Sequence, residues 1–246
     1  MRQTVTSRQN ASVKLAASLH QKKFRDSTGL VWLEGERNLQ SLPEDVKVRF
    51  FVTTDPDSLA DRENVIIVDA GLFGYISGLR TPQGMGAVIE RPADRDICQT
   101  RPRSIVYLER VQNPDNVGAV IRSAACAGFD HVMLSPGCAD CWSPKALRSS
   151  AGNIFSVGVS PGDLGDLERL KDSGAVIIGA HLGGREDFPE AQGSPKVLLV
   201  GNEGSGLSDG ASGLCTHLVR IPMREGCESL NAACAAAVLM YKIMGY

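Results

Sequence analysis

The most constraining feature of this 246-residue chain is a short apolar run that ends abruptly in a glycine-rich turn. The run is Val197 to Val200, and the turn reads Gly201-Asn202-Glu203-Gly204-Ser205-Gly206. A short, continuously apolar segment bounded by turn residues is typical of a strand buried on both faces of a parallel sheet. The glycines allow backbone amides to approach a ligand closely. The sequence therefore predicts a ligand site at the carboxyl end of this strand.

A second strand end and a helix start follow further along the chain. Residues 217–221 predict a short strand that ends in Pro222-Met223-Arg224-Glu225-Gly226. The alanine-rich segment after it predicts a helix, with Ser229 in the N-cap position. Two strand ends and a helix start present several unpaired N–H groups. We expect all three at one edge of a sheet.

Two familiar phosphate-binding motifs do not match the glycine-rich turn. Its spacing, G-x-x-G-x-G, differs from the dinucleotide fingerprint G-x-G-x-x-G. It also lacks the Lys-Ser/Thr pair of a phosphate-binding P-loop. A turn with only a structural role stays open as the alternative.

Composition indicates an ordinary globular protein, with 43% hydrophobic and 22% charged residues. No apolar run approaches the roughly 18 residues of a membrane span, and no secretory signal pattern is present, so we expect a cytoplasmic protein. Seven cysteines, an odd number, favour reduced thiols over a disulfide framework. Cys138 and Cys141 form one C-x-x-C without a second pair, so no metal site is expected.

Charge is unevenly distributed along the chain. The net charge is −2, yet the first 25 residues hold six basic side chains and no acidic one. Local positive charge of this kind favours contact with nucleic-acid phosphates. A solvated helix face is the alternative interpretation.

Strands and helices alternate in two blocks. In the first, we expect helices at 12–23 and 34–42 and strands at 30–33, 48–53, 65–68 and 86–89. In the second, we expect strands at 104–109, 131–134, 153–159 and 175–180 and helices at 117–127, 145–149 and 164–172. Between the blocks, the arginine- and proline-containing segment 91–103 has no apolar periodicity. The sequence predicts an α/β protein with a small domain at 1–90, a linker at 91–103 and a mostly parallel sheet with helices on both faces at 104–246.

Three segments in fixed order carry a family resemblance. They are Asn116-Val117-Gly118-Ala119-Val120-Ile121-Arg122, the turn at 201–206, and Ile221-Pro222-Met223 with Glu228-Ser229-Leu230-Asn231. Together they resemble the three signature motifs of the SpoU family, the TrmH-like RNA ribose 2′-O-methyltransferases. Glu34-Gly35-Glu36 and Thr81-Pro82-Gln83-Gly84 resemble that family's small, ribosomal-protein-like substrate-binding domain.

The resemblance implies properties that the residue pattern does not. It implies a trefoil knot in the domain at 104–246, S-adenosylmethionine as cofactor and structured RNA as substrate, with ribosomal RNA favoured over tRNA. It also implies a homodimer that packs in part through the C-terminal helix. Neither a membrane nor a metal is expected as a partner.

The resemblance also implies roles for single residues. Gly201, Ile221 and Leu230 match positions whose backbone holds the methyl donor, and Asn202 and Met223 belong to the same pocket. The side chain of Leu230 is expected in the core.

Arg122 matches the family's catalytic arginine. A guanidinium is a poor base because it is almost always protonated. We therefore expect Arg122 to bind the adjacent phosphate and orient the ribose hydroxyl, with an RNA phosphate or the arginine itself receiving the proton.

Four polar residues complete the predicted catalytic set. Asn116 and Asn231 are amides suited to orienting backbone or ribose groups. Glu203 is expected to hold Arg122 or a loop amide, and Ser229 to cap its helix and contact substrate. Contacts to RNA phosphates are expected from Arg8, Lys14, Lys22, Lys23, Arg25 and Arg80.

The chain departs from the family pattern at three places. Glu225 replaces a usual glycine, Ala232-Ala233-Cys234 replaces Val-Ser-Val, and Asn202 stands where a smaller residue is common. None of these changes removes a presumed catalytic group. Two other functions stay open: a catalytically silent RNA-binding or ribosome-assembly protein, and an enzyme that modifies a small nucleotide.

Overall fold

The computed structural model describes residues 2–187, 194–224, 226 and 229–246. These residues form two compact units. Residues up to 93 together with 140–155 make the small unit, and 94–139 together with 156–246 make the large unit. Residues 140–155 thus pack with the small unit, whereas the predicted boundary assigns them to the second domain.

The small unit is built on a five-stranded mixed sheet in the order β1-β4-β3-β5-β2. The two ladders formed by β5 are antiparallel and the other two are parallel. Its strands are β1 (Arg2–Thr4), β2 (Leu30–Glu34), β3 (Val48–Thr53), β4 (Val65–Ile67) and β5 (Met85–Glu90).

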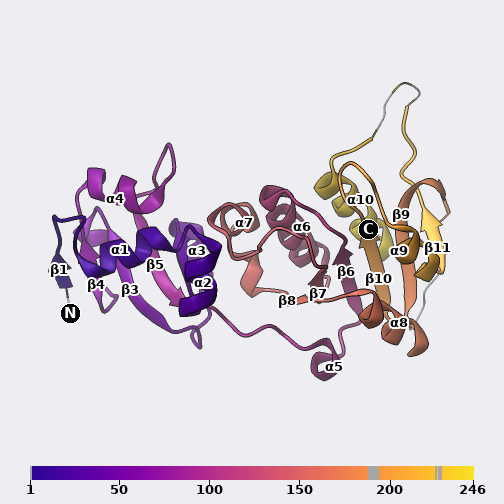
Figure 1. Ribbon diagram of the computed structural model, residues 1–246, viewed down its shortest axis with the longest axis horizontal. Coiled ribbons are helices and arrows are strands. Elements are labelled where there is room, and N and C mark those ends of the chain that lie inside the picture. Colours follow the sequence, from indigo (N-terminus) through magenta and orange to yellow (C-terminus); the bar gives the residue numbers. More distant parts are fainter. Residues whose placement is uncertain (1, 188–193, 225, 227–228) are drawn as a thin grey trace. The chain divides into compact units, whose positions relative to one another are not determined.

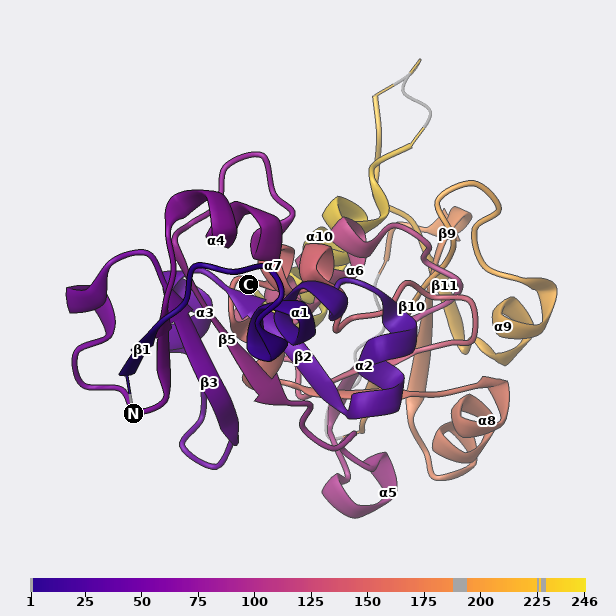
Figure 2. The same ribbon diagram turned by 60° about the vertical axis from the view of Figure 1, so that its left-hand side comes forward.

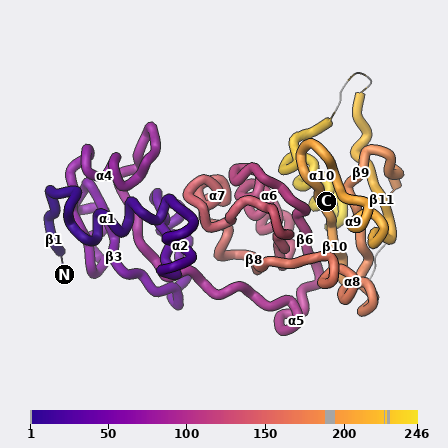
Figure 3. The backbone as a smooth tube through the Cα atoms, in the orientation of Figure 1, coloured from indigo at the N-terminus to yellow at the C-terminus, as the bar shows by residue number. Residues whose placement is uncertain are grey.

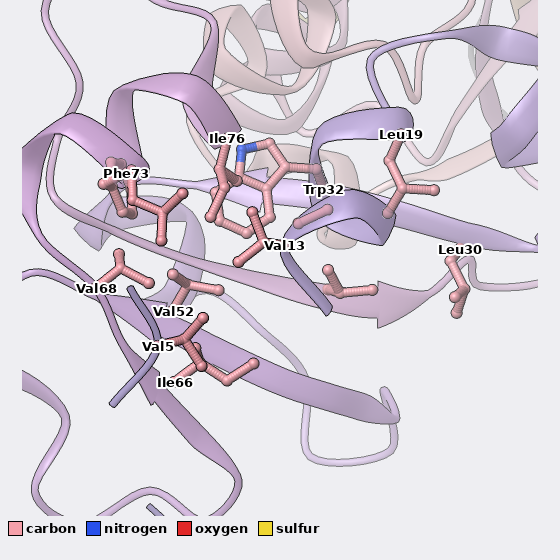
Figure 4. Close-up of a cluster of buried hydrophobic side chains, with 13 residues drawn as sticks. Val5, Val13, Leu19, Leu30, Trp32, Val52, Ile66, Val68, Phe73 and Ile76 are labelled. Atoms are coloured by element: carbon pink, nitrogen blue, oxygen red, sulfur yellow. The ribbon is translucent and has the colours of Figure 1, made fainter. Parts of the chain in front are cut away.

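Helices pack on this sheet around a mostly aliphatic core that includes Trp32 and Phe73. They are α1 (Ala11–Ser18), α2 (Lys22–Thr28), α3 (Glu36–Gln40), α4 (Ala70–Ser77) and, from the later segment, α7 (Pro144–Ser150), which contacts β2; short 3₁₀ turns lie at Pro56–Leu59 and Asn153–Phe155. Figure 4 shows the core side chains, including Trp32 and Phe73, whose ring centroids lie 6.1 Å apart. Burial of these apolar side chains is the main force that stabilises the unit.

The large unit contains a six-stranded sheet in the order β11-β9-β10-β6-β7-β8, parallel throughout (Figure 1). Its strands are β6 (Ser104–Leu108), β7 (His131–Leu134), β8 (Gly158–Pro161), β9 (Val176–Arg185), β10 (Lys196–Val200) and β11 (His217–Val219). The neighbours β9, β10 and β11 can be followed in Figure 2 as well. The predicted apolar run is therefore β10, a central strand between β9 and β6.

Helices cover both faces of this sheet. They are α5 (Ile97–Thr100), α6 (Pro114–Ala127), α8 (Leu164–Asp172), α9 (Asp209–Leu214) and α10 (Ala232–Met244). Alternate strand residues such as Tyr107 and Leu199 pack beneath α8 and α9. The strand residues at the alternating positions, such as Leu198, point to the opposite face and are also fully buried. Helix α10 packs against α6, β9 and β10 (Figure 3).

Several predicted boundaries are wrong for local reasons. The expected helix at 12–23 is two helices, because α1 ends at Ser18 and α2 begins at Lys22. The expected strand at 153–159 begins as a 3₁₀ turn, and only Gly158–Pro161 joins the sheet. The C-terminal helix is capped by Asn231 and not by Ser229, since the Asn231 side chain accepts hydrogen bonds from the backbone of Ala233 and Cys234.

Some features implied by the resemblance stay predictions. The segment expected to form the trefoil knot includes residues 225, 227 and 228, which lie outside the described residues. The departure at Glu225 lies there too, as does Glu228 of the third motif. Among the described residues, no helix is long and apolar enough to cross a membrane.

Candidate active site

The second and third predicted motif segments line one cavity of the large unit, and Asn116 of the first segment is hydrogen-bonded to two of its lining residues. The cavity has a volume of about 490 Å³ and lies where β10 and β11 end. Its lining includes all five residues predicted to bind the cofactor and three of the five predicted to be catalytic: Gly201, Asn202, Ile221, Met223 and Leu230, and Glu203, Ser229 and Asn231. This volume and the mixture of apolar and polar groups are typical of a small-molecule site.

The glycine-rich turn closes on itself beside the cavity. The backbone N–H of Asn202 donates to the Gly206 carbonyl at 3.0 Å, and the N–H of Gly206 donates back at 2.9 Å. A Cβ on Gly201 would lie 2.2 Å from the Gly206 carbonyl carbon, so only glycine fits there. The Asn202 side chain donates to the Arg110 carbonyl at 2.8 Å, which ties the turn to the loop after β6.

A chain of side-chain hydrogen bonds joins the three motifs. The Asn116 amide on α6 donates to Glu203 Oε1 at 2.8 Å. The Asn231 amide donates to Asn116 Oδ1 at 3.0 Å. Asn116 is only 7% exposed and does not line the cavity itself, but it holds two residues that do. Of the two expected partners of Glu203, Arg122 or a loop amide, the described residues show the second: the backbone amides of Gln112 and Asn113, in the loop before α6, donate to Glu203 together with the Asn116 side chain.

Glu203 is held as a carboxylate by this network. Burial alone would raise its pKa. Hydrogen bonds from the Asn116 side chain and from the backbone of Glu203, Gln112 and Asn113 outweigh burial, and the pKa of Glu203 is lowered. The group therefore acts as a fixed acceptor and negative charge near neutral pH.

Unpaired backbone groups border the cavity at the three predicted positions. Within the described part of the chain, Gly201, Ile221 and Leu230 form no backbone hydrogen bond. Free N–H and C=O groups beside a cavity are suited to a ligand that needs both donors and acceptors, such as an adenine ring and an amino-acid group. The donor set thus fits S-adenosylmethionine. The Leu230 side chain is 44% exposed and lines the cavity, so its predicted place in the core is wrong.

Comparisons with known proteins give this site a family. The SpoU rRNA methylase family matches residues 103–241, which include the three motif segments at 116–122, 201–206 and 221–231. The chain belongs to the SpoU rRNA methylase family. An MRM3-like substrate-binding domain matches residues 10–87 of this SpoU-family chain.

Three similar proteins each cover 65% or more of the SpoU-family chain. The chain is 31% identical to the Bacillus subtilis 23S rRNA (guanosine(2553)-2′-O)-methyltransferase RlmP, over 98% of the chain and 99% of the relative. It is 37% identical to a Streptomyces viridochromogenes 23S rRNA (uridine(2479)-2′-O)-methyltransferase, over 65% of the chain and 60% of the relative. The AdoMet-bound rRNA methyltransferase from Sinorhizobium meliloti matches with a TM-score of 0.88 at 28% identity, covering 98% and 97% of the two chains.

Arg122 is the predicted catalytic residue that the single chain does not bring to the cavity. It is exposed on α6 and does not line the cavity. Asn116, six residues earlier on the same helix, is buried. The role of Arg122 stays a prediction.

The predicted RNA contacts in the small unit differ in availability. Arg8 lies over the exposed Tyr75 ring at 4.8 Å, and Lys14 and Arg80 are exposed. Lys22 pairs with Asp26 at 2.7 Å, and Lys23 lies over Phe24 at 4.9 Å.

Arg25 does not fit the prediction of an RNA contact. It is 3% exposed, pairs with Asp140 at 2.6 Å and donates to the Leu19 carbonyl at 2.6 Å. A buried, paired guanidinium is a structural group.

Sequence reasoning missed part of the cavity wall. Ala180, His181 and Leu182 lie on β9, and Ala235 and Leu239 lie on α10. The β9 residues could have been found, because β9 neighbours β10 and the carboxyl ends of adjacent parallel strands share an edge. Among the described residues, no group of three or more potential metal ligands occurs.

Proposed function

We propose that this SpoU-family chain transfers the methyl group of S-adenosylmethionine to a ribose 2′-hydroxyl of ribosomal RNA. The observation that carries the proposal is a cavity that the second and third motifs line with unpaired backbone groups and to which Asn116 of the first motif is joined by hydrogen bonds. Relatives at 31% and 37% identity are named as 23S rRNA 2′-O-methyltransferases, which supports ribosomal RNA as the substrate class. The predicted cytoplasmic location stays a prediction.

The backbone groups and the apolar side chains of the cavity bind different parts of the cofactor. The backbone of Gly201, Ile221 and Leu230 would hold the polar ends of the cofactor, and apolar lining side chains such as Leu239 would pack against it. When bound, the cofactor supplies an electrophilic methyl group on a sulfonium. The closed turn at 201–206 borders the cavity on one side, and Asn202 keeps that turn in place.

The hydrogen-bond network of Asn116, Glu203 and Asn231 fixes the polar side of the cavity. Glu203, Asn116 and Asn231 fix one another, and Ser229 lies next to them on the cavity wall. Alignment of the reacting atoms to within a few tenths of an ångström is the main contribution that such a site makes. Arg122 binds the phosphate next to the target ribose and orients its hydroxyl, with an RNA phosphate or the arginine itself receiving the proton.

In a homodimer, Arg122 of one subunit acts at the cavity of the other subunit. The exposed face of α10 carries Val238, Tyr241 and Met244, and α10 packs against α6, which carries Arg122. An apolar helix face of this kind suits a second copy of the chain. Pairing through α10 and α6 would place Arg122 at the interface, where it reaches the cavity of the other subunit.

Methylation of ribosomal RNA by the purified protein tests the proposed function. Labelled methyl groups are expected at one ribose of ribosomal RNA, and a transcript with a 2′-deoxy nucleotide there should accept none. Binding of the donor and of RNA without transfer would identify a silent RNA-binding protein. Equal activity on free nucleosides would identify a small-nucleotide enzyme.

Two variants test Arg122. Arg122→Lys should lower the single-turnover rate, because a lysine cannot form the bidentate phosphate contact. Mixing Arg122→Ala subunits with Asn231→Ala subunits should restore activity in mixed dimers if Arg122 serves the partner's cavity. A near-normal rate for the lysine variant would exclude a special role for the guanidinium.

A further inference from the structure

A second cavity of the large unit lies at the opposite edge of its sheet. It has a volume of about 530 Å³ and is lined by residues at or beside the amino ends of β6, β7 and β8: Arg103, His131 and Gly158. The linker segment, with Arg95 and Arg101, forms another wall. Because the strands are parallel, this cavity lies at the amino edge and the candidate active site at the carboxyl edge.

The charge of this cavity is strongly positive. Three arginines line it, against one carboxylate, Asp130. That carboxylate already accepts hydrogen bonds from the backbone of Arg103 at 2.8 Å and of Ser104 at 3.0 Å, and from the Ser104 hydroxyl at 3.0 Å. Within the described residues, neither Arg95 nor Arg101 forms an ion pair with a carboxylate. A net positive cavity in a chain of net charge −2 is a local feature that calls for a negative ligand.

The buried His131 forms a neutral floor for this cavity. It is 1% exposed, and its Nε2 lies 2.8 Å from the Ser160 hydroxyl. Burial, and then the positive charge of Arg95, lower the pKa of His131 to about 4, although Asp130 acts in the opposite direction. The ring is thus uncharged near neutral pH, and Arg95 lines the same cavity.

We propose that this cavity binds a phosphate group of the RNA backbone through Arg95 and Arg101, with Arg103 beside them. Guanidinium groups match phosphate oxygens in bidentate fashion, which is why arginines recur at such sites. The volume lies within the usual range of ligand cavities. The linker, which the sequence predicts only as a spacer, then becomes part of the substrate-binding surface. The inference rests on the proposed function, since it takes RNA as the substrate.

The distance between the two edges favours a polynucleotide. Strand β6 has five residues and therefore spans ~17 Å. A structured RNA whose target ribose lies at the carboxyl edge is large enough to bring another phosphate to the amino edge. Such a contact fixes the position of the RNA and contributes affinity without reading sequence.

The first test measures RNA affinity in the full-length protein. The double variant Arg95→Gln with Arg101→Gln should raise KM for RNA about tenfold and leave kcat and donor affinity unchanged. The slope of log affinity against log salt should fall by about 2, one for each lost phosphate contact. The matched control is Arg169→Gln with Lys171→Gln, which removes the same charge from the exposed Arg169 and the half-buried Lys171 on α8 of the same unit.

The second test is independent of methyl transfer. Titration of the wild-type protein with inorganic phosphate should shift the imidazole resonances of His131, and the double variant should show no shift. If the wild type binds phosphate but never methylates RNA, the proposed function fails and the anion site stands. If phosphate binds but the RNA affinity of the double variant equals that of the control, the cavity takes a small phosphate ligand and the proposal of an RNA contact is overturned. No shift of His131 in the wild type overturns the site itself.

Discussion

At the scale of single residues, Asn116 joins the three motifs. Its amide donates to Glu203 and its carbonyl accepts from Asn231, so both halves of one side chain are used. The sequence places an amide in this segment and a carboxylate in the turn, but it contains no signal that the two meet. The meeting depends on β6 and β10 being neighbours in the sheet, which is a property of the whole fold.

Removal of that amide should impair catalysis more than stability. Asn116→Ala leaves Glu203 and Asn231 without a common partner, and we expect the methyl-transfer rate to fall on the order of 100-fold through misalignment. The pKa of Glu203 should rise, because the hydrogen bond from Asn116 lowers it now. Single-turnover kinetics measure the rate. Asn113→Ala is the control: it removes the N-cap of the same helix, costs about 1 kcal/mol of stability and should spare the rate. Equal rates for the two variants would contradict the role of Asn116.

The buried ion pair between Arg25 and Asp140 should contribute to the free energy of unfolding of the small unit. Asp140→Asn keeps the acceptor for the Trp142 backbone but removes the charge that compensates Arg25, so the free energy of unfolding should fall by about 3 kcal/mol. Lys22→Ala removes the exposed pair with Asp26 from the same helix and should cost at most about 0.5 kcal/mol. Denaturant unfolding measures both. A loss for Asp140→Asn no larger than that for Lys22→Ala would show that Arg25 does not depend on its partner.

At the scale of elements, the sequence predicts the bounds of strongly periodic segments better than the cap of the C-terminal helix. The apolar run of β10 and the boundaries of β3, β7 and α8 match their predicted ranges closely, because hydrophobic periodicity fixes them. The start of α10 does not match: Ser229 and Asn231 are both good caps, and the hydrogen bond between Asn231 and Asn116 favours the second. Local sequence cannot weigh a contact with a distant helix.

The exposed face of α10 should carry the dimer contact. Val238 and Tyr241 are 47% and 41% exposed, and the Tyr241 ring lies 5.5 Å from the ring of Tyr246. Val238→Lys puts a charge in the middle of this face and should convert a dimer to a monomer in analytical ultracentrifugation. Glu168→Lys introduces the same side chain at an exposed position of α8 and should leave the mass unchanged. If both variants keep the wild-type mass, the dimer does not use this face.

At the scale of the whole molecule, stability should depend on pH through His131. Its folded-state pKa of about 4 lies below its ordinary value of 6.5, so protonation favours the unfolded chain. The contribution is therefore complete above pH 6.5 and is lost as the pH falls towards 4, by about 3 kcal/mol in total. When the free energy of unfolding is measured across this pH range, its dependence on pH should be weaker in His131→Gln than in the wild type. The exposed His217→Gln should keep the wild-type slope, and identical slopes in all three proteins would rule out His131 as the source.

The division into two units leads to a constraint on how the chain is made. The small unit needs residues 140–155, and α7 from that segment contacts β2. During synthesis, the first 93 residues therefore emerge before their last structural part exists, and the start of the large unit emerges in between. The small unit can complete its folding only once the ribosome has passed residue 155. Fragments cut at the linker should for the same reason lack a piece of the small unit, so neither domain can be exchanged between relatives as a simple terminal block.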